Sequence, residues 1–367
     1  MRKSRLALGL VVVLALGLVS TACSKSDSSD GSKESTTTTA AGPKAPTDAE
    51  IKALTAKLAG GGASFPDAFY QAVNADFNKV QGTELVTYAK SGSSDGRKQL
   101  AAKTLDFAGS DSLPKPEETF PGPVLYFPTV AAPITVAYNL QGVSGLKLSA
   151  DTVAKIFSAQ ITSWDDPAIA AENKGAKLPA TPIVVVHRSD GSGTTSNFTK
   201  YLVAAAPNTW KLGNGDTVNW PATTQGAEKN SGVAALIAQT AGGVGYVDLA
   251  DAAKAKLSVA EIQNSSGNYV GPTAKGVQAA LEAAEVKPDL TYNPLNTSGA
   301  DAYPITAPTW IMTYGTYSDA AKVASLQTYL KYVLTTGQKQ AGGLGYASLP
   351  TSLAQKAYDQ VAQIKQG

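Results

Sequence analysis

The sequence is almost empty of the residues that bind metals or form disulfides. Its 367 residues include one cysteine, Cys23, and one histidine, His187. A single cysteine excludes a disulfide within the chain, and this pair is too small for a zinc site made of cysteine and histidine. We therefore expect no metal and no other cofactor.

Charged residues are also scarce, and the two signs are nearly balanced. They make up 16% of the chain, with 31 basic and 29 acidic side chains. Arg2, Lys3 and Arg5 lie in a segment that we expect to be removed, which leaves 28 basic against 29 acidic residues. A chain with this balance has no basic stripe to neutralise phosphates along a nucleic acid backbone. Nucleic acid binding is therefore excluded.

One long apolar run is present, at residues 6–19, and it is short for a membrane span. Basic residues precede it, and the small residues 20–22 lead from it into Cys23. This order resembles a bacterial lipoprotein signal peptide over residues 1–22, with Cys23 as the lipidated first residue of the mature chain. An ordinary secretory signal is the alternative. Both predict export, and lipidation predicts anchoring to the outer face of the cytoplasmic (cell) membrane.

Residues 23–46 combine this cysteine with a tether rich in serine and threonine, which has no aliphatic residue larger than alanine after Cys23. Such a segment cannot bury a core, and as a coil it would extend over roughly 25–30 Å. The remaining residues 47–367 exceed one comfortable core, so two domains are expected.

The stretch 183–200, IVVVHRSDGSGTTSNFTK, places a strand, an arginine and a helix start in succession. Residues 183–186 form a β-branched run, residues 190–194 a turn of Gly, Ser, Thr and Asp, and Thr195 begins a predicted helix. The free N–H groups and the dipole of a helix start favour an anion, and Arg188 adds a full charge. We interpret the stretch as an anion cradle. A solvated turn with a threonine cap is the alternative.

Two further loops rich in glycine and serine lead into predicted helices, at residues 60–66 and 91–96. Because α/β folds bind ligands outside the carboxyl ends of strands, three such loops can converge on one cleft for a small oxyanion. Asp111, at the end of a predicted strand over 105–108, only accepts hydrogen bonds when ionised. It would then prefer hydrogen phosphate to fully ionised sulfate. A turn or a strand-end cap is the alternative for Asp111.

The order of predicted elements indicates an α/β fold. Helices and strands alternate between residues 150 and 247, and β-rich runs that contain proline occur at 126–139 and 303–314. If these runs cross between domains, residues 47–132 plus 300–367 form lobe I and residues 133–299 form lobe II. A ligand cleft would then lie between the lobes.

Nine motifs in order carry a family resemblance. They are GGGASFPDAFY (60–70), SGSSDGRKQL (91–100), LDFAGSDSLP (105–114), FPTVAAPITVAYN (127–139), ITSWDDPAI (161–169), VVVHRSDGSGTTSNFTKYL (184–202), NSGVAALIAQTAGGVGYV (230–247), YPITAPTWIM (303–312) and QAGGLGYASLP (340–350). The chain resembles the substrate-binding subunit of the high-affinity phosphate ABC transporter, a class II periplasmic-binding-protein fold. The resemblance implies a monomeric receptor, not an enzyme, that delivers hydrogen phosphate to a permease and its ATPase for import.

The family's phosphate ligands map onto eight positions of this sequence. They are Ser64, Phe65 through its backbone N–H, Ser93, Asp111, Arg188, Ser192, Gly193 and Thr194. The chain departs from the pattern in two places. Ser64 stands where threonine is common, which keeps the hydroxyl, and Asp95 lies two residues after Ser93, where it either weakens anion binding or points to solvent.

Three other functions are compatible with parts of the sequence. Residues 92–96 fit the G-x-S-x-G pattern of a hydrolase, with Ser94 as nucleophile and His187 as base, but the preceding strand is short and polar. We regard His187 as a strand-end residue without a chemical role. The same fold could take sulfate, molybdate or an organic phosphate, and Asp111 disfavours the first two. A surface lipoprotein that has lost binding is disfavoured by the presence of Arg188, Asp111 and Ser192.

Overall fold

The structure is a computed structural model that describes residues 42–367. The predicted signal peptide, Cys23 and the tether up to residue 41 lie outside the described residues. None of the helices in this described part combines the length and apolar character that crossing a bilayer requires.

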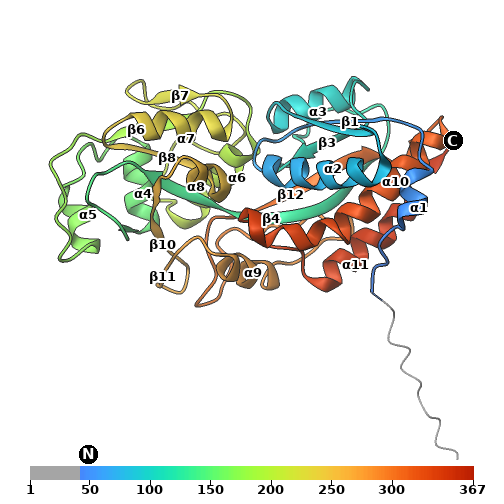
Figure 1. Ribbon diagram of the computed structural model, residues 1–367. Coiled ribbons are helices and arrows are strands. Elements are labelled where there is room, and N and C mark those ends of the chain that lie inside the picture. Colours follow the sequence, from blue (N-terminus) through green and yellow to red (C-terminus); the bar gives the residue numbers. More distant parts are fainter. Residues whose placement is uncertain (1–41) are drawn as a thin grey trace, which may run out of the picture. The chain divides into compact units, whose positions relative to one another are not determined.

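Nine strands of the described residues form one mixed sheet (Figure 1). Its strands are β1 (Leu58–Gly62), β2 (Val86–Lys90), β3 (Phe107–Ser110), β4 (Val124–Tyr138), β6 (Val184–Arg188), β7 (Gln225–Ala227), β8 (Gly243–Asp248), β9 (Ser258–Val259) and β12 (Thr306–Tyr314). The order is β2-β1-β3-β12-β4-β8-β6-β7, and β9 pairs with β4.

The sheet contains two groups of parallel strands separated by antiparallel ones. β1 pairs in parallel with β2 and β3, and we call these three the N-terminal strand group. β6 pairs in parallel with β7 and β8, and we call these the central strand group. β12 and β4 lie between the groups, and every pairing along that path from β3 to β8 is antiparallel. Both groups therefore resemble the βα units that the sequence predicts.

Strand β4 links the two groups and changes partner within its length. Residues 124–133 pair with β12, whereas residues 134–138 pair with β8. Figure 1 shows this long strand running from one group to the other. The change, between residues 133 and 134, lies one residue from the predicted lobe boundary, and the predicted crossing at 126–139 overlaps this strand. The division into two lobes itself stays a prediction.

Helices cover the sheet and connect its strands. They are α1 (Asp48–Lys52), α2 (Asp67–Gln81), α3 (Ser93–Ala101), α4 (Ala150–Phe157), α5 (Pro167–Glu172), α6 (Gly193–Ala205), α7 (Lys229–Gln239), α8 (Leu249–Lys254), α9 (Ala274–Glu282), α10 (Ala320–Leu334) and α11 (Thr351–Gln360). Short 3-10 helices are η1 (Gly337–Gln340), η2 (Gly342–Leu344) and η3 (Val361–Gln363). Small separate sheets contain β5 (Lys147–Leu148), β10 (Glu261–Gln263), β11 (Tyr269–Val270), β13 (Thr316–Tyr317) and β14 (Lys365–Gln366).

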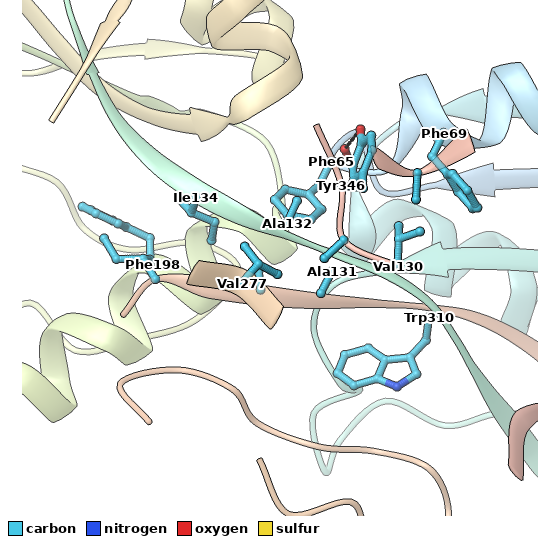
Figure 2. Close-up of a cluster of buried hydrophobic side chains, with 14 of the residues drawn as sticks. Phe65, Phe69, Val130, Ala131, Ala132, Ile134, Phe198, Val277, Trp310 and Tyr346 are labelled. Atoms are coloured by element: carbon cyan, nitrogen blue, oxygen red, sulfur yellow. Dashed lines mark hydrogen bonds between the residues drawn. The ribbon is translucent and has the colours of Figure 1, made fainter. Parts of the chain in front are cut away.

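The hydrophobic core follows β4. From Phe127 to its end, every residue of this strand is buried. A strand covered on both faces needs an almost uninterrupted run of apolar and small residues, which explains why this stretch shows no alternation. Figure 2 shows Val130, Ala131, Ala132 and Ile134 in this core, with the rings of Phe65 and Tyr346 packed nearby.

Two helices begin earlier than the sequence indicates, and both carry predicted site residues. Helix α3 begins at Ser93, directly after Gly92, whose φ of 103° makes the turn that a residue with a Cβ rarely adopts. Helix α6 begins at Gly193 rather than Thr195, because Ser192 takes the N-cap position. Two of the three predicted loops therefore run into the first turns of helices, whereas in the loop at 60–66 residues 60–62 belong to strand β1 and α2 begins only at Asp67.

Candidate ligand-binding site

The predicted site residues lie where strands of the two parallel groups end. Ser64 follows β1, Ser93 begins the helix after β2, and Asp111 directly follows β3. In the central strand group, Arg188 is the last residue of β6, and residues 192–194 form the start of α6, which follows β6. Carboxyl ends of parallel strands are the usual ligand position in α/β sheets. The topology therefore provides two sets of polar residues, one from each group.

Residues at these strand ends contact each other directly. Asn197 in α6 donates a hydrogen bond from Nδ2 to the carbonyl oxygen of Asp111 at 2.5 Å. A Cβ atom added at Gly193 would lie 2.5 Å from Ser93 Oγ and 2.8 Å from Asp111 Cβ. Only glycine allows this approach, so the first turn of α6 lies against the end of β3 and the start of α3.

Four predicted site hydroxyl groups share one arrangement, because each oxygen accepts a hydrogen bond from a protein N–H group. The pairs are Ser64 Oγ with Asn230 N (3.2 Å), Ser93 Oγ with Asp111 N (3.2 Å), Ser192 Oγ with Thr195 N (3.1 Å) and Thr194 Oγ1 with Asn230 Nδ2 (3.2 Å). A hydroxyl has one proton, and an N–H group that occupies its oxygen leaves that proton available for another acceptor. All four residues are buried. They are therefore prepared to donate to an anion.

The start of α6 adds backbone donors. The Thr195 N–H is used by the cap Ser192, while no hydrogen bond within the described residues uses the N–H groups of Gly193 and Thr194. First-turn N–H groups have no partner inside a helix, and the helix dipole adds partial positive charge at this end. This helix start can therefore bind an oxyanion, as the sequence indicates.

Asp111 supplies an acceptor among these donors. Its side chain is 2% exposed, and Oδ1 has no hydrogen-bond partner among the described residues. Oδ2 has one distant donor, Ser93 Oγ at 3.5 Å. Burial raises the pKa of Asp111 to about 7, although the nearby charge of Arg188 opposes this effect. A buried, unpaired carboxylate oxygen favours a ligand that carries a proton.

Arg188 is held from two sides. Its Nε donates to Asp190 Oδ1 at 2.6 Å, its Nη2 to Asp190 Oδ2 at 2.5 Å, and its Nη1 to Asn230 Oδ1 at 2.6 Å. A guanidinium has five N–H donors, so two stay free for a ligand. Although burial raises the pKa of Asp190, the hydrogen bonds and charge of Arg188 hold it below its usual value. Arg188 is thus a fixed donor whose charge is largely balanced by a neighbour.

Asn230 connects more site residues than any position that the sequence singled out. Besides accepting from Arg188, its side chain donates to Thr194 and to Asp248 Oδ2 at 2.8 Å, and its backbone donates to Ser64. Asn230 is not among the site residues predicted from the sequence. A signal was present, because Asn230 opens one of the family motifs in a helix start after a short strand.

Phe65 holds the first loop against the core. Its ring is fully buried and packs edge-on against Tyr346, with ring centres 6.3 Å apart (Figure 2). The Tyr346 hydroxyl donates to the Phe65 carbonyl oxygen at 2.7 Å. Within the described residues no hydrogen bond uses the Phe65 N–H, which leaves it available to a ligand.

Ser94 and His187, the nucleophile and base of the alternative hydrolase interpretation, share no hydrogen bond in the described residues but have separate partners. Ser94 donates to Asp216 Oδ2 at 2.6 Å, whereas His187 contacts its neighbour's carbonyl oxygen and stacks on Trp220. Strand β2, which precedes Ser94, is at the edge of the sheet, unlike the buried strand of a nucleophile elbow. Asp95 is half-buried, and its Oδ2 accepts from Gln99 on the same helix.

Together these residues form a cage of neutral donors with one arginine and one carboxylate acceptor. Within the part of the chain that the structure describes, no cluster of three or more His, Cys, Asp or Glu residues is suited to a metal ion. The arrangement matches the chemistry of a small oxyanion that still carries a proton.

Comparison with known proteins identifies the family, since the sequence model of the PBP superfamily domain matches residues 32–337. Phosphate-binding protein PstS of Xylella fastidiosa is 36% identical over 306 residues, covering 82% of this chain and 83% of the relative. PstS of Pasteurella multocida is 35% identical over 305 residues, covering 82% and 88%. The chain therefore belongs to the PstS family of phosphate-binding proteins, and the predicted family is confirmed.

A solved structure supports the fold separately. The phosphate binding protein from Stenotrophomonas maltophilia matches with a TM-score of 0.66 at 22% identity, covering 83% of this chain and 94% of that protein. This likeness concerns the fold alone. Together with the superfamily match, it confirms the predicted α/β periplasmic-binding-protein fold.

Proposed function

We propose that the protein binds inorganic phosphate, as hydrogen phosphate, and delivers it to an ABC permease for import. Its family is that of proteins named for phosphate binding. The observation that carries the proposal is the arrangement of four buried hydroxyls, whose oxygens each accept from an N–H group, so that each proton is directed to another acceptor. In the described residues the proton of Ser93 has only the distant Asp111 Oδ2, at 3.5 Å. The ligands we propose are Ser64, Phe65, Ser93, Asp111, Arg188, Ser192, Gly193 and Thr194.

The acceptor Asp111 supports hydrogen phosphate over other tetrahedral anions. Hydrogen phosphate can donate its proton to the free Oδ1, whereas fully ionised sulfate and molybdate would bring only acceptors toward a buried carboxylate. The enclosure of the site opposes larger ligands, because Ser64, Asp111 and Arg188 are each at most 4% exposed. The organic group of a phosphate ester would need to separate the residues that enclose the site.

Binding is coupled to closure of two lobes, with the lobe boundaries that the sequence predicts. The N-terminal strand group supplies Ser64, Ser93 and Asp111, and the central strand group supplies Arg188 and the start of α6. One anion satisfies both sets only when they are in contact, so it favours the closed form by differential binding. Opening about the strands between the groups would release it.

The protein acts as a receptor and not as an enzyme. Its relatives are named as binding proteins, and Ser94 and His187 have separate hydrogen-bond partners. Incubation with p-nitrophenyl phosphate and p-nitrophenyl acetate should release no nitrophenol above a Ser94→Ala control. Turnover that this substitution abolishes would contradict the receptor proposal.

Residues 1–46 suggest where the receptor works. We propose that residues 1–22 direct export and that Cys23 carries the lipid that anchors a monomer to the outer face of the cell membrane. The tether would hold the binding domain near the permease and its ATPase. Mass spectrometry of the protein from membranes checks this, since an N-terminal lipid on Cys23 is expected and an unmodified mature chain would contradict it.

Calorimetry of the purified protein tests the ligand. Bound anion should first be removed by mild unfolding and refolding, and phosphate and sulfate titrated separately at neutral pH. We expect one phosphate per chain and no heat from sulfate. A folded sample that gives no phosphate heat would overturn the proposal.

A further inference from the structure

A buried ion pair joins the two strand groups outside the predicted ligands. Arg97 Nη2 lies 2.6 Å from Asp216 Oδ2, and the side chains are 0% and 6% exposed. Arg97 is on α3, which packs against β1 and β3, while Asp216 lies in the segment between α6 and β7. In the sheet, β12, β4 and β8 separate these regions. The pair therefore bridges the groups directly.

Asp216 forms further bonds in both directions. Its Oδ2 also accepts from Ser94 Oγ at 2.6 Å, next to the ligand-site residue Ser93. Its backbone carbonyl oxygen accepts from the N–H of Ser192, the cap of α6, at 2.9 Å. One residue thus connects the start of α3 to the start of α6, the two helix ends that supply site hydroxyls.

Arg97 also has partners within its own strand group, which do not depend on the contact with Asp216. Arg97 donates from Nε and Nη2 to Glu118, at 2.7 and 2.8 Å, and from Nη1 to Ser110 and Ser112. If the groups separated, Arg97 would keep these four bonds, whereas the Asp216 carboxylate would lose both donors and meet water. Although burial raises the pKa of Asp216, the charge and hydrogen bond of Arg97 hold it below its usual value.

We propose that Arg97 and Asp216 form a latch that holds the closed site together and slows the release of phosphate. The inference rests on the proposed function and deepens it. A charge-assisted bond that exists only in the closed form adds to the barrier for opening, while it contributes nothing to the first encounter with the ligand. The backbone contact from Ser94 N to the Gly191 carbonyl oxygen, at 3.3 Å, lies beside it and opens with it.

Asp216→Asn tests the latch with little change in shape, because the backbone bond to Ser192 is retained. The rate of phosphate release would be followed by stopped-flow tryptophan fluorescence after the labelled or bound phosphate is displaced, and the association rate of phosphate would be measured separately. We expect release about 10-fold faster or more, since hydrogen bonds to charged groups contribute roughly that factor, and association within about 2-fold of the wild type. An unchanged release rate would overturn the latch and leave phosphate binding standing.

Two control variants separate a latch from a general structural role. Asp301→Asn removes the ion pair of Asp301 with Lys275, which has the same 2.6 Å length but lies at the surface, with the Lys275 side chain 81% and the Asp301 side chain 62% exposed. This variant should leave the rate of phosphate release unchanged. Glu118→Gln weakens Arg97 within its own group and should not accelerate release. Faster release in either control, comparable with Asp216→Asn, would contradict the latch.

A further measurement follows the closed form itself. In hydrogen–deuterium exchange with phosphate at a concentration that saturates both proteins, Asp216→Asn should accelerate exchange around residues 92–97 and 190–195, while exchange around β1 and β8 stays as in the wild type. Unchanged exchange in the first two segments, or equal acceleration everywhere, would overturn the latch. Wild-type exchange in these two segments that phosphate does not slow would instead contradict the proposed function.

Discussion

Ser64 Oγ accepts a hydrogen bond from the backbone N–H of Asn230 at 3.2 Å, although 166 residues separate them. Ser64 follows the first strand of the N-terminal strand group, and Asn230 lies in the central strand group. The bond occupies the hydroxyl oxygen and directs its proton elsewhere. The same hydroxyl therefore joins the groups and prepares a donor for the ligand.

Two substitutions of Ser64 should distinguish the contribution of its hydroxyl to phosphate binding from that of the rest of the loop. Ser64→Ala is expected to weaken phosphate binding by about 10-fold or more, because a hydrogen bond to a charged ligand is lost. Ser64→Thr keeps the hydroxyl and should bind within about 3-fold of the wild type. Calorimetry checks both, with exposed Ser266→Ala as the matched control. Equal affinities for the alanine and threonine variants would remove this hydroxyl from the site.

Arg188 should contribute most to affinity. Arg188→Met removes the only positive charge among the proposed ligands and leaves the partly buried Asp190 without its cation. We expect a loss of about 100-fold or more, because truncating one partner of a buried charge pair costs roughly 2–5 kcal/mol. Arg188→Lys keeps the charge but loses the planar arrangement of donors, so its phosphate affinity should lie between those of the wild type and the methionine variant. Near-normal phosphate affinity of the methionine variant would exclude Arg188 as a ligand.

Asp111 should control the discrimination between phosphate and sulfate, in a way that depends on pH. The pKa of its buried carboxyl is raised to about 7, so the neutral, proton-donating form increases as the pH falls through that value. Sulfate can then accept a bond. We expect sulfate to compete with phosphate for the wild-type protein below pH 7 and to stop competing above it.

Asp111→Asn provides the matching variant, because its amide donates at every pH. It should admit sulfate equally from pH 5.5 to 8.5, as measured by competition with labelled phosphate. Selectivity that stays at the wild-type level in this variant would contradict the role of Asp111 as discriminator.

Gly193→Ala should hinder closure without affecting the backbone. The residue has an ordinary helical position, but an added Cβ would lie 2.5 Å from Ser93 Oγ and 2.8 Å from Asp111 Cβ. We expect phosphate affinity to fall by about 10-fold or more, while the melting temperature without ligand stays near that of the wild type. Gly343→Ala, which meets nothing within 4 Å, is the control. Wild-type phosphate affinity in Gly193→Ala would contradict this prediction, because it would show that Ser93 and Asp111 can move to accommodate the added Cβ.

Local chemistry explains what the sequence predicted well. Glycine and serine before an amphipathic run indicate a helix start wherever they occur, and the β-branched run before Arg188 indicates a strand. These signals located the loops that carry Ser93 and Ser192. The exact helix starts were displaced because they depend on a cap and on the positive φ of Gly92.

Contacts between distant segments explain what the sequence missed. Asp216 lies in a loop without a motif, and its partner Ser94 is 122 residues away. Asn197 looks like an ordinary helical residue until α6 approaches Asp111. Such roles follow from how the two strand groups meet, which no local pattern encodes.

The position of β12 in the sheet has a consequence for the order in which the chain folds. Residues 306–314 insert between β3 and β4, so β3 lacks its inner neighbour until most of the polypeptide has been synthesised. Until then the inner edge of β3 is unpaired, which exposes backbone donors and acceptors to other chains. Folding dominated by such distant pairings is slow. The nascent chain should therefore depend on protection by chaperones until β12 emerges.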